Sequence, residues 1–173
     1  MIHRSHPQFS LCGLNCALCP RYNTVGPSRC PGCGALKFSE FHPTCAIMTC
    51  NNKKEQAAFC FQCSSYPCAR YQGDDKDSFI TYVNRLRDLH QARLDLDVYL
   101  QNLEQKTRIL RHLLERYDDG RSKSFFCLAV NLLQTDDLLE VLDSLTESSD
   151  TKAVRQQLST MAQKRGISIA LRK

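Results

Sequence analysis

The sequence CGLNCALCP, residues 12–20, contains three cysteines with the spacing C-x3-C-x2-C. It begins a run of ten cysteines that ends at Cys68, and the eleventh cysteine, Cys127, stands apart from them. Cysteines at this density in a reducing compartment indicate metal binding or redox chemistry, because disulfides are uncommon there. The segment before Cys12 has no apolar core of a secretory signal, so we expect a cytoplasmic protein. An exported disulfide-bonded protein is the competing interpretation.

The ten clustered cysteines have the spacings of metal ligands. We predict all ten as ligands: Cys12, Cys16, Cys19, Cys30, Cys33, Cys45, Cys50, Cys60, Cys63 and Cys68. Two cysteines two residues apart can face one ion when the backbone turns tightly between them, as Pro31 and Gly32 allow in CPGCG. A second C-x2-C pair at residues 60–63 gives the pattern of a four-cysteine tetrahedral site. The spacing leaves open which cysteines share a metal, and we expect His42 to be a surface loop histidine.

The identity of the metal is the main ambiguity. CPGCG is typical of a zinc knuckle, whereas CGLNCALCP is more typical of an iron–sulfur run in which a proline follows a cysteine ligand. Thiolates bind both metals, so the ligand type does not decide between them. We favour zinc in a structural or partner-binding role. The alternative is a 4Fe–4S cluster that serves electron transfer or an anaerobic redox enzyme.

The spacing of residues 12–20 also occurs in radical enzymes that cleave S-adenosylmethionine. Those enzymes enclose their cofactor in a large, mostly parallel α/β barrel. Here no strand-rich pattern precedes Cys12, and helical patterns dominate the C-terminal half of the chain. The chain therefore cannot build such a barrel.

The formal charge of +5 is concentrated in the cysteine-rich part. Residues 1–72 contain seven lysines and arginines against only Glu40 and Glu55, whereas residues 73–173 are balanced. A basic surface usually indicates nucleic-acid binding, which we keep as a second alternative. Metal-bound thiolates are negatively charged, however, so two four-cysteine zinc sites would offset most of this excess. The charge therefore favours metal sites over a nucleic-acid surface.

The composition changes near residue 72. Residues 1–72 hold all six prolines and few aliphatic side chains, so this module cannot bury much apolar surface and needs metal to fold. Residues 73–173 carry amphipathic helical patterns. We predict a mainly α fold, in which a cysteine-rich module (1–72) packs on a helical domain of about five helices (73–173). No apolar run is long enough for a membrane helix.

Three- and four-residue apolar spacing predicts these five helices. We place them after a cap at Asp75 or Asp77, from about Leu94 to Tyr117, and over residues 124–134, 136–145 and 152–165. The first would bury Phe79, Tyr82, Val83, Leu86 and Leu89. The second has a packing seam with a seven-residue repeat, formed by Leu96, Leu103, Leu110 and Tyr117.

Two further segments have clear patterns. Segment 124–134 is apolar nearly all round, which predicts a buried central helix with Cys127 as a small buried hydrophobe. The tail, residues 167–173, alternates like a strand but has no evident pairing partner. We expect it either to add to a small sheet in the cysteine module or to lie extended on the helices.

The cysteine-rich segment resembles an uncharacterised family of bacterial and archaeal proteins, a domain of unknown function often described as metal-binding. The motifs that carry the resemblance are CGLNC, CPRY, CPGC, CAIMTC and CFQCSSYPC, within about residues 11–71. The resemblance implies that the cysteines are ligands and supplies no reaction. Catalytic residues, substrate, protein partner and oligomeric state are unassigned, and whether the protein is an enzyme stays open.

Overall fold

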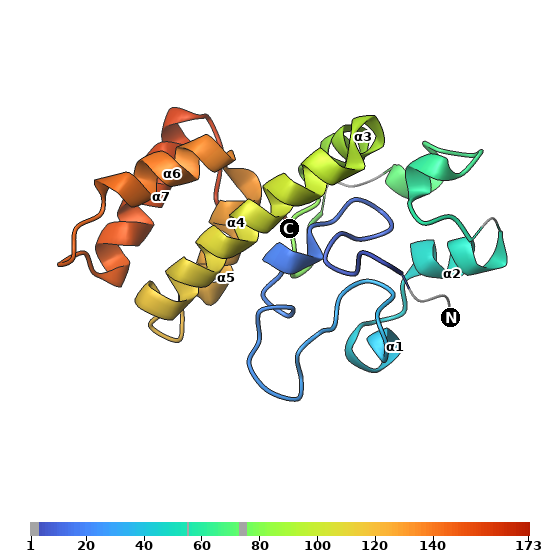
Figure 1. Cartoon of the computed structure of the whole chain (residues 1–173), viewed down its shortest axis with the longest axis horizontal. Coiled ribbons are helices and arrows are strands. Elements are labelled where there is room, and N and C mark those ends of the chain that lie inside the picture. The colour runs from blue at the N-terminus through green and yellow to red at the C-terminus, as the bar shows by residue number, and fades with distance from the viewer. Residues whose placement is uncertain (1–3, 55, 73–75) are drawn as a thin grey trace.

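The computed structural model describes residues 4–54, 56–72 and 76–173. These residues form seven α-helices, three short 3-10 helices (η) and no strand, which confirms the mainly α prediction. In chain order they are η1 (Cys16–Leu18), α1 (Phe38–Phe41), α2 (Ala46–Lys53), η2 (Cys60–Gln62), η3 (Ala69–Tyr71), α3 (Arg85–Leu94), α4 (Leu96–Tyr117), α5 (Lys123–Leu132), α6 (Thr135–Ser144) and α7 (Thr151–Lys164). Figure 1 shows α6 and α7 at one end of the molecule and the cysteine-rich segments at the other.

Helix α4 connects the two ends of the molecule. It begins at Asp95, whose carboxylate accepts a hydrogen bond from the backbone N–H of Val98 at 3.0 Å. Its apolar face packs on α3, α5, α6 and η1. Leu103, Leu110 and Tyr117 of the predicted seam are buried. The cysteine-rich part contacts the helices through η1, which packs on α4 and α5, and through η2, which packs on α3 (Figure 1).

Helix α5 is the buried central helix that the sequence predicts. Phe126, Cys127 and Val130 are at most 1% exposed. The helix spans Lys123–Leu132, close to the predicted range 124–134. Helices α6 and α7 also form close to their predicted positions, which places five α-helices between residues 76 and 173.

The prediction for the first helix of this domain is wrong at its start. Helix α3 begins at Arg85, and Asp77 caps no helix. The Asp77 carboxylate instead accepts a hydrogen bond from the N–H of Tyr82 and forms an ion pair with Arg172 at 2.8 Å. Val83 and Leu86, which the prediction placed on the buried face, are 53% and 45% exposed. The cause is a contact between positions 77 and 172, which a local pattern cannot contain; Asp75 lies outside the described residues.

The C-terminal tail is extended and forms no strand. The N–H of Asp77 donates to the carbonyl of Arg172, and the N–H of Arg172 donates to the Asp77 carboxylate, both at 2.9 Å. Ile167 and Ile169 pack against the main core. Of the two predicted arrangements, the structure has the tail lying on the helices.

One continuous core joins the two halves of the chain. Phe9, Leu18 and Phe59 from the cysteine-rich part belong to the same buried cluster as Leu110 and Phe126. The division near residue 72 stays a prediction, and Gly73, Asp74 and Asp75 at that boundary lie outside the described residues.

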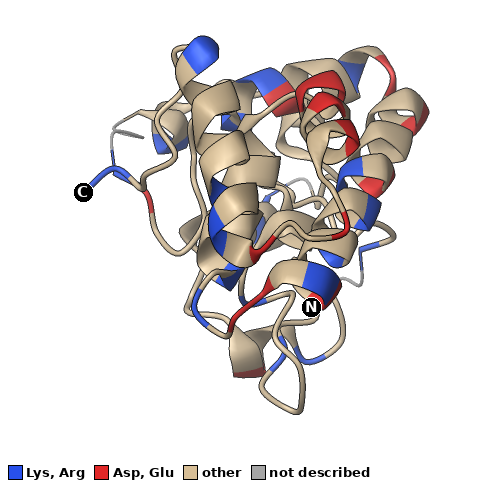
Figure 2. Cartoon of the chain, turned by 90° about the vertical axis from the view of Figure 1, so that its left-hand side faces the viewer, with Lys and Arg blue, Asp and Glu red and all other residues tan. Residues whose placement is uncertain are grey.

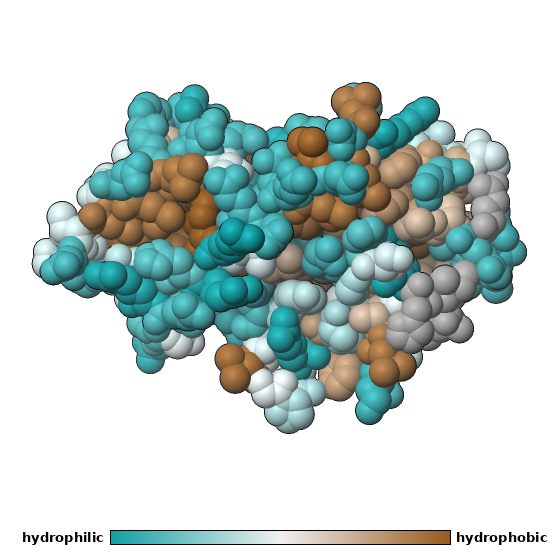
Figure 3. Space-filling view, viewed as in Figure 1, coloured by the Kyte–Doolittle hydropathy of each residue, from teal (hydrophilic) through white to brown (hydrophobic). Residues whose placement is uncertain are grey.

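The surface is mostly polar. Acidic and basic residues are interspersed over the helices in Figure 2. Figure 3 shows separate apolar patches, one of them over the end formed by α6 and α7. Within the described ranges, no helix is both long and apolar enough to cross a lipid bilayer.

Candidate metal centre

Two glycines set the path of the cysteine-rich loops. Gly13 has a φ of +93°, and a Cβ at this position would collide with the carbonyl oxygen of Arg85 and the side chain of Leu89. Gly32 has a φ of +94°, and a Cβ there would collide with the carbonyl of Pro7. Only glycine adopts such backbone conformations without strain and permits these close approaches. Gly13 thus seats the first cysteine turn on α3, and Gly32 seats CPGC against the N-terminal segment.

One set of thiols gathers around the buried side chains of Leu11 and Met48. We call it the first thiol group; its members are Cys12, Cys16, Cys33 and Cys45. Cys16, Cys33 and Cys45 belong to this small apolar cluster. Burial, followed by repulsion from the thiolate of Cys33, holds the pKa of Cys16 well above its ordinary value. Burial also raises the pKa of Cys33 to about 11, and the neighbouring thiolates of Cys12 and Cys45 add to this rise.

Backbone and hydroxyl groups donate hydrogen bonds toward these sulfurs. The N–H of Met48 donates a hydrogen bond to Sγ of Cys45 at 3.5 Å. The backbone of Cys33 lowers the pKa of Cys16, against the larger effect of burial. Oγ of Ser10 lies 3.2 Å from Sγ of Cys12. Hydrogen bonds to sulfur favour the charged thiolate, the form that binds metals.

A second set of thiols lines one small cavity. We call it the second thiol group; its members are Cys50, Cys60, Cys63 and Cys68. The cavity has a volume of about 40 Å³ and is also lined by Ile47 and Tyr71. Burial raises the pKa of Cys60 to about 12, against a hydrogen bond from the Tyr71 hydroxyl that lowers it. The thiolates of Cys12, Cys68 and Cys63 contribute to the rise, in this order, so Cys60 is also a neighbour of Cys12 in the first thiol group.

The remaining two predicted ligands lie beside each other. Cys19 and Cys30 are both buried, and the Cys30 thiolate adds to the rise in the pKa of Cys19 that burial causes. Cys127 of α5 is a neighbour of Cys19: burial, followed by the Cys19 thiolate, raises the pKa of Cys127 to about 12. Cys127 is 1% exposed, as the sequence predicts.

All eleven cysteines are free thiols. Among residues 4–54, 56–72 and 76–173, no three side chains of His, Cys, Asp or Glu converge as ligands of a single ion. The chemistry of the donors nevertheless suits a thiolate-binding metal, because each group brings four thiols together in an apolar environment. The structure thus shows clustered thiols without ligand geometry.

His42 lies in the loop after α1 and is half-buried. Its ring stacks on Phe38 with centroids 4.5 Å apart and contacts Phe79 at 5.7 Å. Its Nδ1 lies 2.8 Å from the carbonyl oxygen of Pro43. These contacts give His42 a packing role.

Sequence reasoning missed a polar network behind the first cysteine turn. Asn15, 5% exposed, donates hydrogen bonds to Asp88 at 2.9 Å and Asn131 at 3.2 Å, and its Oδ1 accepts one from the Tyr99 hydroxyl at 2.8 Å. The network borders a cavity that also contains Lys106. Its sequence signal was Lys106 itself, a charged residue between Leu103 and Leu110 of the buried seam.

Residues 8–73 match a family model described as "Protein of unknown function (DUF3795)". The match covers all ten clustered cysteines and confirms the predicted resemblance to a cysteine-rich domain of unknown function. No curated protein and no solved structure has a significant match to the chain.

Proposed function

We propose that the cysteine-rich module is a zinc–thiolate module with two four-cysteine sites, one in each thiol group, and with a structural or partner-binding role. The observation that carries the proposal is the cavity of the second thiol group. Three separate segments bring Cys50, the pair Cys60 and Cys63, and Cys68 to one apolar space. Four half-buried thiols around one apolar space are the donor set of a closed tetrahedral zinc site.

The surroundings of the first thiol group support the same function. Its four cysteines also come from three segments, around residues 12–16, 33 and 45. The N–H groups that point at its sulfurs match the outer hydrogen bonds that orient metal ligands. Metal binding would displace the protons of these thiols, and the positive charge of the ion would offset the cost of burying several thiolates together.

The size of the second cavity favours a single ion over a cluster. A cavity needs a volume of roughly 10–15 Å³ to hold one buried water. The cavity of the second thiol group, at about 40 Å³, therefore has room for only a few atoms. A 4Fe–4S cluster brings eight atoms. Binding one zinc ion would require rotations about the Cα–Cβ bonds of the cysteines, because their sulfurs do not yet converge.

The position of Cys19 also favours zinc. An iron–sulfur site built on CGLNCALCP would use Cys12, Cys16 and Cys19 together. Cys16 has the thiolates of Cys33, Cys12 and Cys19 as neighbours, with Cys33 acting on its pKa most strongly, whereas the thiolate that acts on Cys19 is that of Cys30. This order favours Cys33 over Cys19 as a partner of Cys16, and the 4Fe–4S cluster is the less supported alternative.

The basic residues of the module support a structural role more than nucleic-acid binding. Arg4 donates hydrogen bonds to the carbonyls of Ala58 and Phe9, both at 2.9 Å, and lies over the ring of Phe59. Arg29 donates to the carbonyl of Tyr22 and lies over its ring. These guanidinium groups and rings already contact each other, which leaves fewer of them to bind phosphates or stack bases.

In four-thiolate sites all coordination positions of zinc are filled by protein. Such a site holds loops together and offers no open position for a substrate. The module's own side chains would therefore fix the loop geometry, exclude water from the sulfurs and present a defined surface.

Metal analysis of protein purified without oxygen tests the proposal. We expect about two zinc ions per chain, no bound sulfide and no visible absorbance. A brown protein that contains iron and sulfide would refute the zinc proposal in favour of the 4Fe–4S cluster. Fewer than one metal per chain would refute metal binding altogether.

Single serine variants test the assignment of cysteines to sites. Cys33→Ser should remove the metal of the first group, and Cys63→Ser should remove that of the second. Cys30→Ser is the matched control, a buried cysteine of a C-x2-C pair that belongs to neither group. Equal metal loss from Cys30→Ser and Cys33→Ser would contradict the assignment.

A further inference from the structure

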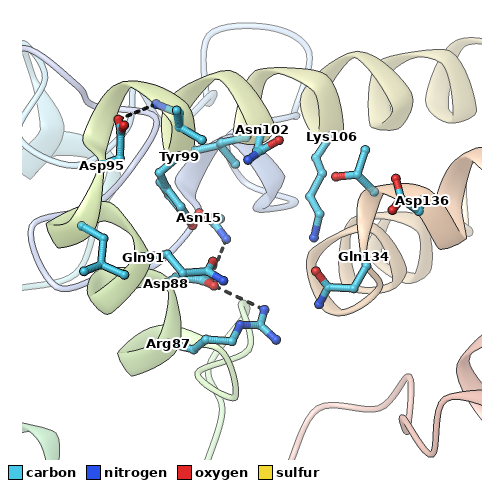
Figure 4. Close-up of a pocket in the computed structure, with 14 residues that line it drawn as sticks. Asn15, Arg87, Asp88, Gln91, Asp95, Tyr99, Asn102, Lys106, Gln134 and Asp136 are labelled. Atoms are coloured by element: carbon cyan, nitrogen blue, oxygen red, sulfur yellow. Dashed lines mark hydrogen bonds and ion pairs between the residues drawn. The ribbon is translucent and has the colours of Figure 1, made fainter.

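A polar cavity lies between the cysteine module and the helices, apart from both thiol groups. It has a volume of about 460 Å³, within the range of small-molecule sites. Its walls come from α3, α4, the start of α6 and Asn15. Figure 4 shows the side chains of Lys106, Arg87 and Gln134 around one open space, with Asp88 and Asn15 behind it.

The polar groups at the back of the cavity are already hydrogen-bonded. Asp88 is 4% exposed, and its carboxylate accepts hydrogen bonds from Asn15 and from Arg87 at 3.3 Å. Tyr99 donates its hydroxyl proton to Asn15. Asp95, another acid at the cavity, accepts the capping hydrogen bond from Val98. A carboxylate that already accepts such hydrogen bonds repels a bound anion less than a carboxylate without hydrogen-bond donors does.

Two cations share the cavity. The ammonium of Lys106 uses one of its three N–H donors in a hydrogen bond to the carbonyl oxygen of Leu133 at 2.5 Å. The guanidinium of Arg87 uses one of its five N–H donors in a hydrogen bond to the carboxylate of Asp88. Burial lowers the pKa of Lys106 to about 8; Asp88 acts against this shift, and the positive charge of Arg87 adds to it. The two cations thus have unused donors. Two buried carboxylates act on Lys106, Asp88 and Asp137, and Asp137 is already ion-paired with Arg165.

The start of α6 adds further donors at the same place. Gln134 precedes the helix, and its side chain makes no capping hydrogen bond. Gln134, Thr135 and Asp136 all line the cavity. The first N–H groups of a helix carry partial positive charge and favour anions, although Asp136 at the rim opposes a highly charged one.

We propose that this cavity is a binding site for a small oxyanion, the carboxylate or phosphate group of a small polar molecule, held between Lys106, Arg87 and the start of α6. An anion there would separate the two cations and use their free N–H donors. The site goes beyond the proposed zinc module, because none of its residues is a thiol ligand.

Titration of the metal-loaded full chain, followed by amide NMR shifts, tests this site. The probes are inorganic phosphate and acetate at constant ionic strength, with chloride as the reference anion. We expect saturable shifts centred on Gln134, Thr135 and Lys106. Saturation by phosphate alone identifies a phosphate-type ligand, and saturation by acetate alone a carboxylate.

Matched variants separate specific binding from a general charge effect. Lys106→Gln and Arg87→Gln should each weaken binding at least about tenfold. Arg93→Gln, also on α3, and Lys123→Gln, a half-buried lysine of α5, should leave it unchanged. The side chain of Arg87 is 44% exposed, so its replacement keeps the fold even if that of Lys106 does not. Absence of saturable shifts with both anions, or binding unaffected by Arg87→Gln, would overturn the proposal.

Discussion

The two halves of the chain bury different kinds of side chain. In the helical half, leucines and other apolar residues of α4 to α7 fill the core, as Leu110, Leu133 and Leu158 do at no more than 1% exposure. In the cysteine-rich half, thiols occupy much of the interior, and Cys12 and Cys33 are 7% and 6% exposed. Burial of apolar side chains stabilises the folded state without any ligand. Buried thiols contribute most to the stability of the fold when a metal binds them. We therefore expect the halves to respond to different perturbations.

Removal of metal should give the largest effect and should be confined to the cysteine-rich half. Structural zinc contributes on the order of 10 kcal/mol in small modules. A chelator should broaden the amide NMR signals of residues 4–72, while far-UV circular dichroism keeps most of the helical signal from α4 to α7. Equal loss of structure in both halves would show that the common core, with Phe9 and Leu18, makes them one cooperative unit.

A core substitution should weaken the helical half without releasing metal. Leu110→Ala removes a completely buried side chain and should lower the free energy of unfolding by about 3 kcal/mol. Leu94→Ala, at a leucine that is 74% exposed, is the control and should change it by less than about 0.5 kcal/mol. Denaturant unfolding and metal analysis measure the two quantities. Zinc release by Leu110→Ala would show that the metal sites depend on the core of the helical half, which contradicts the expected independence of the two halves.

Asn15 is the place where the two halves depend on each other. Asn15→Ala removes three buried hydrogen bonds and leaves Asp88 without its amide donor, so we expect a loss of about 3 kcal/mol. Asn102→Ala, at an exposed position of α4, serves as the control. The measurement is denaturant unfolding of both variants. Equal stabilities would mean that the network adds nothing to the junction.

The burial of Lys106 should make the free energy of unfolding depend on pH in a definite direction. Burial lowers its pKa from 10.5 to about 8, so between these values the unfolded chain binds more protons than the folded chain. Stability should therefore rise with pH across this window, by about 2 kcal/mol after allowance for solvent. Lys106→Gln should remove this contribution, and the difference between the two unfolding curves cancels the cysteines and tyrosines that titrate nearby. A difference that does not vary with pH would contradict the burial of a charged amine.

Cys127→Ser should have the smallest effect. Metal content should stay the same, because Cys127 belongs to neither thiol group. The free energy of unfolding should fall by about 1 kcal/mol, since a hydroxyl replaces a thiol at a position that is 1% exposed. Loss of metal would instead assign Cys127, with its neighbour Cys19, to a third site.

The sequence predicts those features that depend on local pattern. The seam of α4 and the buried α5 follow from apolar periodicity, and the cysteine spacings indicate thiol clusters. The grouping of the cysteines depends on loop paths, such as the close approach of Gly32 to Pro7. The late start of α3 depends on Asp77 meeting Arg172. Neither contact leaves a pattern in the local sequence that would predict it. Lys106 does leave such a pattern, because it is a charged residue in an apolar seam, and it indicates where the cavity lies.

Asn15 also determines how the protein would age chemically. Its amide group is fully used, with both N–H donors and the oxygen engaged. Deamidation would turn it into an aspartate, replace a donor by an acceptor and set a second carboxylate beside Asp88. Two carboxylates this close in a buried place repel each other, which would weaken the contact between α3 and the first cysteine turn. The exchange of one amide nitrogen for oxygen would then destabilise the junction at Asn15, while the common core still joins the two halves.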